Sequence, residues 1–262
     1  MKEFAKHESW LIQRDDIIVE SHQVGSGGFG LVLSAQYAGG RVALKTHKDV
    51  LSKMRELKNA VGRELRALRN LRHPCIVSFY GAMIDESKPE IFMVEELVEG
   101  VSMKQYYQDP EGVISDDMKL QHLRQLISVL EYLHRDDPGI IHGDIKPSNV
   151  MITNGLNVVK LIDFGLSWKA KSHSEGRGGS IRYKSPELLL CKEVSYGSDM
   201  FAFGRLAYFV STGHEPLSGL QQEELVELAR RQELPELHWG NSTFETFCKD
   251  LCGSCCCFRE SE

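Results

Sequence analysis

The residues best suited to chemistry lie in two short runs near the middle of the chain. Residues 142–150 read HGDIKPSNV and residues 161–165 read LIDFG. Asp144 is a candidate proton acceptor, Lys146 supplies a positive charge, and Asn149 and Asp163 offer the oxygen ligands that Mg²⁺ prefers. A base, a cation and two ligands for a hard metal ion, in this order, are typical of phosphoryl transfer.

The segment between these runs explains how distant residues could meet. Residues 150–153 (VMIT) and 158–162 (VVKLI) are expected to form two short strands, with Asn154-Gly155 in the connection where a tight hairpin turn is needed. The hairpin places Asn149 and Asp163 side by side at one end of the strand pair, where both could bind one cation, with Asp144 nearby.

A glycine-rich run near the N-terminus offers a place for phosphates. Glycine has no Cβ, so the backbone can approach a phosphate closely. The same spacing fits a dinucleotide-binding turn, in which a helix follows the third glycine. Here residues 17–19 precede the run and residues 31–35 continue it as a strand, so a hairpin tip is predicted. The run comprises Val24, Gly25, Ser26, Gly27, Gly28, Phe29, Gly30, Leu31 and Val32.

The next predicted strand, residues 41–45 (RVALK), adds a cation to this region. Alternation along a strand puts Ala43 and Lys45 on the same face. A small residue beside a lysine could admit a flat base and reach its phosphates.

With both clusters in this order, the sequence resembles the eukaryotic protein kinase family, from about residue 10 to about residue 256. The resemblance implies that ATP and Mg²⁺ are the cofactors. It also implies the roles of individual residues. Lys45 would hold the α- and β-phosphates and pair with Glu64, Asp144 would be the catalytic base, Lys146 would stabilise the transferred phosphoryl group, and Asn149 and Asp163 would bind Mg²⁺.

Glu64 is supported by the pattern around it. Residues 50–71 carry apolar residues at helical spacing, which predicts one buried stripe. Glu64 lies at the edge of this stripe, where a carboxylate needs a cation, and Lys45 supplies one.

The resemblance places a hinge after the strand at residues 91–94. There the backbones of Glu96 and Val98 would hydrogen-bond adenine, while Val32 and Met151 would sandwich the ring. Counting back from Glu99-Gly100 puts Glu95 at the gatekeeper position, which is usually apolar or a threonine. The alternative is a register shifted by one residue, with Val94 as gatekeeper and Glu95 in the solvated hinge.

The implied fold is α+β and two-lobed, with a small antiparallel-sheet N-lobe containing one helix and a larger, mainly helical C-lobe. A single kinase domain is expected over residues 1–262, divided into an N-lobe (1–97), a C-lobe (98–257) and a short tail (258–262). Helices are expected at 118–134, from 197, at 223–231 and at 244–256. Kinases end with a further C-lobe helix, whose arginine pairs with the residue at the position of Glu187. This helix is missing from the sequence pattern. A shortened gene product, or a partner protein that completes the lobe, would account for its absence.

Three local features refine the expected activity. Lys146 and the runs at 179–183 (GSIRY) and 185–187 (SPE) resemble serine/threonine kinases, and residues 10–12 and 37–45 resemble the tyrosine-kinase-like group.

The resemblance also implies contacts within the catalytic loop. His142 is expected to stack on Phe164, and Asp199 to hold the backbone of the catalytic loop. Gly143 stands where many kinases have an arginine that reads a phosphate, so activity is hypothesised not to require loop phosphorylation.

The sequence therefore predicts a serine/threonine protein kinase that acts on protein substrates. The alternative is a catalytically silent pseudokinase that serves as a nucleotide-binding scaffold, which Gly143, Glu95 and the missing helix suggest. Phosphorylation of a small molecule is disfavoured by Tyr183 and the SPE run.

Composition excludes other classes. A net charge of -6 gives no electrostatic footprint for nucleic acid. No apolar run is long enough to span a membrane and the N-terminus lacks a signal-peptide core, so a cytoplasmic location is expected, with the nucleus as an alternative. Five of the seven cysteines crowd residues 248–257, with spacing that disfavours zinc; they are expected to pack on a helix, as free thiols.

Overall fold

The computed structural model describes residues 10–27, 30–46, 68–85, 90–169, 179–190 and 194–256. The chain divides into two compact units, Met1–Glu99 and Gly100–Glu262. This division falls two residues after the expected lobe boundary at 97/98. The expected helix at 50–71, together with Glu64, and residues Gly28 and Phe29 lie outside the described residues, apart from residues 68–71.

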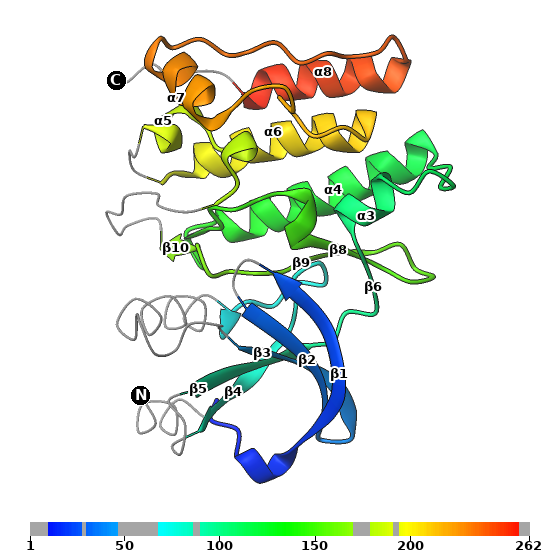
Figure 1. Cartoon of the computed structure of the whole chain (residues 1–262), viewed down its shortest axis with the longest axis vertical. Coiled ribbons are helices and arrows are strands. Elements are labelled where there is room, and N and C mark those ends of the chain that lie inside the picture. Colours follow the sequence, from blue (N-terminus) through cyan, green and yellow to red (C-terminus); the bar gives the residue numbers. More distant parts are fainter. Residues whose placement is uncertain are drawn as a thin grey trace. The chain divides into compact units, whose positions relative to one another are not determined.

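The first unit is built on one antiparallel sheet of five strands, ordered β1-β2-β3-β5-β4 (Figure 1). A short 3₁₀ turn, η1 (Arg14–Asp16), precedes it. The strands are β1 (Ile17–Gly27), β2 (Gly30–Tyr37), β3 (Gly40–Thr46), β4 (Phe79–Asp85) and β5 (Glu90–Glu96). The described part of the glycine-rich run lies at the ends of β1 and β2, where Gly27 pairs with Gly30, so these two strands form a β-hairpin as the sequence predicted.

The two faces of this sheet carry separate apolar clusters. Leu44 and Val94 are cross-strand partners and belong to a buried cluster with Ile17 on one face. Met93, one residue before Val94, packs with Trp10 in a second cluster. Side chains alternate along a strand, so β5 presents Val94 to one face and its neighbours to the other.

The second unit is mainly helical and carries three short strands in one sheet and two in another. Its helices are α3 (Met103–Tyr107), α4 (Asp116–Leu133), α5 (Pro186–Leu189), α6 (Tyr196–Thr212), α7 (Gln222–Arg230) and α8 (Thr243–Cys255). The sheets are β6 (Gly100–Ser102), β8 (Val150–Thr153) and β9 (Val159–Leu161), and β7 (Ile140–Ile141) with β10 (Trp168–Lys169). Two further 3₁₀ turns are η2 (Pro147–Asn149) and η3 (Ile181–Tyr183). The two-lobed kinase fold with a strand-rich and a helical part is thus confirmed.

Helix α4 shows how far the apolar pattern determined burial. The Ser115 side chain caps its N-terminus by accepting a hydrogen bond from the N–H of Met118. The helix therefore starts at Asp116, two residues earlier than expected. Leu123 and Leu130 are buried as the pattern predicts, but Ile127 is 37% exposed. His122, which the pattern does not mark, is fully buried.

Helix α6 is the centre of the second unit and lies between α4 and α8 (Figure 1). Ser195 begins it with a capping box, and Gly213 ends it in a left-handed conformation at φ 73°. None of the helices in the described ranges is both long and apolar enough to cross a membrane.

The contact between α6 and α8 depends on Gly204. A Cβ at this position would lie 2.7 Å from Cys256 Sγ and 2.9 Å from Cys255 Cβ, closer than real side chains approach. Cys248, Cys252 and Cys256 are buried free thiols on this side of α8. The prediction that the cysteines pack on a helix is therefore confirmed for these three; Cys257 lies outside the described residues.

Candidate active site

The carboxylate of Asp144 is held by three donors from different parts of the second unit. Lys146 Nζ lies 2.6 Å and Asn149 Nδ2 3.0 Å from Asp144 Oδ2. The backbone N–H of Ser180 donates to Asp144 Oδ1 at 3.1 Å. Asp144 is only 6% exposed, so these contacts fix the orientation of a nearly buried acid. Lys146 and Asn149, both predicted site residues, are thus brought directly onto Asp144.

The predicted hairpin is confirmed and brings Asn149 to Asp163. Strands β8 and β9 pair antiparallel with Val150 opposite Leu161. The N–H of Ile162 donates to the Asn149 carbonyl at 2.9 Å, which places Asp163 one residue from this contact. Asp163 adopts a left-handed conformation with φ 67°, which aspartate tolerates better than most residues.

The donor set at this end of the hairpin fits a hard cation. Asn149 Nδ2 donates to the Asp144 carbonyl and to its carboxylate, so the amide nitrogen is committed and its oxygen remains the ligand atom. Asp163 adds a half-buried carboxylate. One amide oxygen and one carboxylate are the ligand types that Mg²⁺ takes from proteins beside substrate phosphates.

Asp199 on α6 positions the loop that carries Asp144. Its Oδ2 accepts hydrogen bonds from the N–H of His142 at 2.8 Å and from His134 Nε2 at 2.9 Å. Its Oδ1 accepts from the N–H of Gly143 at 2.9 Å. The expected role of Asp199 in holding the backbone of the catalytic loop is confirmed, and His134 joins it.

His142 is a structural residue of this loop. Its ring packs edge-on against Phe164, with ring centres 4.7 Å apart, as expected. Nδ1 accepts the N–H of Asp144, so the ring proton lies on Nε2, 3.3 Å from the Ile162 carbonyl. Complete burial lowers the pKa of His142, although Asp199 and nearby carboxylates act in the opposite direction. The imidazole is therefore neutral and links the two functional runs.

Gly143 has a conformation that favours glycine. Its φ is 77°, and a Cβ would lie 2.7 Å from the Leu166 carbonyl oxygen. Any other residue here would be strained and would displace this carbonyl. Gly143 thus relieves strain immediately before Asp144.

In the first unit, strand pairing decides which residue occupies the gatekeeper position. Ala43 pairs with Glu95, and Lys45 pairs with Met93, so these four side chains share one face. Val94 packs in the apolar cluster on the other face. Of the two alternatives, Glu95 is therefore the gatekeeper, and the interpretation with Val94 in that position is wrong.

Glu95 and Lys45 are both nearly buried, at 6% and 8% exposure. Glu95 lies two positions along β5 from the partner of Lys45, a diagonal that long side chains can span. This face therefore presents opposite charges beside the small side chain of Ala43.

The remaining residues that the sequence predicts to contact the nucleotide belong to both units. Val32 pairs with Lys45 across β2 and β3, and Gly25 with Val32 across β1 and β2. Glu96 ends β5, and its N–H donates to the Ser78 carbonyl at 2.8 Å. Val98 follows β5, and Met151, half-buried on β8, belongs to the second unit.

Sequence reasoning missed the part played by Ser180. Its N–H contact to Asp144 spans 36 positions. Gly179 beside it has φ 83°, and a Cβ there would lie 3.1 Å from Asp144 Oδ1. The donor is a backbone N–H, so the residue types carry no signal for this contact, and the run at 179–183 indicates only a resemblance to serine/threonine kinases.

Comparison with known families agrees with this arrangement. Residues 18–262 match the family described as "Protein kinase domain". The chain belongs to the protein kinase family. Its relatives include a protein of Acanthamoeba polyphaga mimivirus named as a serine/threonine-protein kinase/receptor, which is 33% identical over 80% of this chain and 13% of its own length.

Two further relatives are shorter proteins. "Serine/threonine-protein kinase VIK" of Arabidopsis thaliana is 32% identical over 77% of this kinase chain and 47% of its own length. "Serine/threonine-protein kinase mos" of Patiria pectinifera is 31% identical over 75% of the chain and 57% of its own length. The kinase chain thus spans between about an eighth and somewhat more than half of these relatives.

Proposed function

We propose that this kinase transfers the γ-phosphate of ATP to serine and threonine hydroxyls of proteins. The observation that carries the proposal is the Asp144 carboxylate, held by Lys146, Asn149 and the Ser180 N–H in a nearly buried position. Its relatives are named as serine/threonine kinases, which supports the same acceptor.

Each group on this carboxylate has a role in the proposed reaction. Asp144 accepts the proton of the attacking hydroxyl, and its fixed orientation aligns that hydroxyl. Lys146 provides positive charge beside the base, where the phosphoryl group is transferred. Asn149 and Asp163 would hold Mg²⁺, which neutralises charge on the phosphates. In the first unit, Ala43 would lie against the adenine and Lys45 would bind phosphate.

Two finer statements belong to the same proposal. The runs at residues 10–12 and 37–45 favour the tyrosine-kinase-like group, whose members mainly phosphorylate serine and threonine. Gly143 supplies no guanidinium to bind a phosphorylated activation loop. We therefore propose that phosphatase treatment leaves activity intact; abolished activity would contradict this.

The test measures transfer of labelled γ-phosphate from ATP with Mg²⁺ to mixed protein substrates. The wild type is compared with Asp144→Asn and Lys45→Met, and with Lys249→Met as the matched control on the exposed side of α8. Labelled phosphoserine or phosphothreonine should form with the wild type and control, and each site variant should lower the rate by at least about 100-fold. Nucleotide binding without transfer by the wild type would identify a pseudokinase instead.

A further inference from the structure

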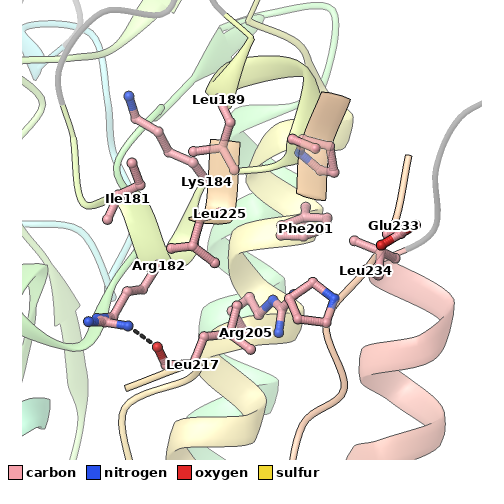
Figure 2. Close-up of a pocket in the computed structure, with 13 residues that line it drawn as sticks. Ile181, Arg182, Lys184, Leu189, Phe201, Arg205, Leu217, Leu225, Glu233 and Leu234 are labelled. Carbon is pink, nitrogen blue, oxygen red and sulfur yellow. Dashed lines mark hydrogen bonds between the residues drawn. The ribbon is translucent and has the colours of Figure 1, made fainter. Parts of the chain in front are cut away.

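A small cavity lies away from Asp144, among α5, α6, α7 and the segment after α7. Figure 2 shows its lining, which includes Ile181 and Lys184 of the segment that follows Ser180, and Leu225 of α7. Its volume is about 20 Å³, compared with the roughly 10–15 Å³ that one water needs. The cavity therefore has room for one small ligand.

Arg205 of α6 is the buried charge in this cavity. It is only 3% exposed, and its side chain extends toward Glu233 and Leu234 (Figure 2). Nε and Nη1 are buried, and neither donates a hydrogen bond to any residue that the structure describes. The guanidinium carbon lies 5.3 Å from the Phe201 ring centre, a contact that holds the group in place without supplying negative charge.

A buried guanidinium without a counter-charge is strongly unfavourable. Burial lowers the pKa of Arg205, and the Cys256 and Cys252 thiols offset this only in part. Arginine nevertheless keeps its proton at neutral pH. Glu233 lines the cavity, but it is exposed, and none of the ion pairs found among the described residues joins it to Arg205. An external negative charge would satisfy the guanidinium.

Arg182 and Lys184 also line the cavity, but their charged groups point away from Arg205 (Figure 2). Arg182 is already committed, because Nη1 donates to the Leu217 carbonyl. The buried guanidinium of Arg205 therefore favours an anion, and the volume of about 20 Å³ suits one not much larger than a water molecule.

We propose that Arg205 binds a small monovalent anion of about chloride size in the cavity formed by α5, α6 and α7. The anion would satisfy the buried guanidinium and connect α6 to the segment at 181–189. Ser180, whose N–H contacts Asp144, immediately precedes this segment. Anion binding would therefore stabilise the part of the chain that helps to orient the base.

The test uses the purified chain and chloride as the probe. Chloride replaces gluconate, which is too large for the cavity, at constant ionic strength, and the Tm is recorded. At ten times its Kd, chloride should shift the unfolding equilibrium of the wild type about elevenfold and raise the Tm by about 3–6 °C, with saturation. Arg205→Met should remove the saturable rise.

A second pair of variants keeps the test decisive if Arg205→Met does not fold. Glu233→Gln removes the acid at the cavity, and the exposed Glu236→Gln is the matched control. Glu233→Gln should lower the chloride Kd about two- to fivefold, and Glu236→Gln should leave it unchanged. Hydrogen exchange at residues 181–189 should slow with chloride in the wild type.

Two results would overturn the proposal. One is a Tm of the wild type that does not depend saturably on chloride. The other is the same chloride response in Glu233→Gln and Glu236→Gln.

Discussion

Replacing Asp199 by asparagine should loosen the loop that carries Asp144. The carboxylate accepts three hydrogen bonds, from the N–H groups of His142 and Gly143 and from His134 Nε2, over 2.8–2.9 Å. An asparagine has only one oxygen. Its amide nitrogen would face a donor, and at least one buried N–H would lose its acceptor.

The magnitude follows from these contacts. An unsatisfied buried donor costs about 1–3 kcal/mol, and the remaining bonds lose the strengthening that the negative charge gives. Asp199 is 1% exposed, so water cannot replace the lost acceptor. Asp199→Asn should therefore lower the free energy of unfolding by about 3 kcal/mol, which corresponds to a fall in Tm of about 6–12 °C.

The assay is urea denaturation, together with phosphate transfer at a temperature where the variant is folded. Asp250→Asn, the same change at an exposed position of α8, is the control and should alter stability by less than about 0.5 kcal/mol. The transfer rate of Asp199→Asn should fall about tenfold or more, because the base moves with its loop. Equal stability of the two variants would refute this account of the loop.

Three further outcomes are expected. Gly143→Ala should lower the free energy of unfolding, measured by urea denaturation, by about 2–3 kcal/mol, since φ is 77° and the new Cβ would meet the Leu166 carbonyl. The control Gly253→Ala places its Cβ in open space on α8 and should raise the free energy of unfolding by about 0.5–1 kcal/mol. Burial lowers the pKa of His122 to about 4, so as pH falls below about 6.5 the unfolded chain binds this proton before the folded chain does. The free energy of unfolding should therefore fall by about 2 kcal/mol between pH 7 and pH 5 because of this residue. In urea denaturation at several pH values, His122→Gln should show a weaker dependence of the free energy of unfolding on pH. Gly204→Ala should lower the Tm by several degrees in a thermal scan, because its Cβ would lie 2.7 Å from a sulfur near the end of α8; an unchanged Tm would show that α8 shifts freely.

Sequence reasoning worked where the controlling contacts were local. The β8–β9 hairpin follows from two short apolar runs and a turn with Asn154-Gly155, so the approach of Asn149 to Asp163 could be predicted. The positions of α4, α7 and α8 were predicted to within two residues because helical periodicity is encoded within each segment, while the start of α6 was predicted to within one residue from the family resemblance.

It failed where a residue's environment is set by distant parts of the chain. The choice between Val94 and Glu95 required the register of β5 against β3, about 50 positions away. Ile127 continues an apolar stripe, yet it is partly exposed because burial depends on what packs against α4. Ser180 contacts Asp144 through its backbone, and a backbone donor has no residue type by which sequence could reveal it.

The placement of Glu95 has a consequence for chemical probes of this kinase. A ligand that extends an apolar group past Ala43 would meet the nearly buried carboxylate of Glu95, on the same face as Lys45, in place of an apolar or threonine side chain. Inhibitors designed around an apolar or threonine gatekeeper should therefore bind poorly here.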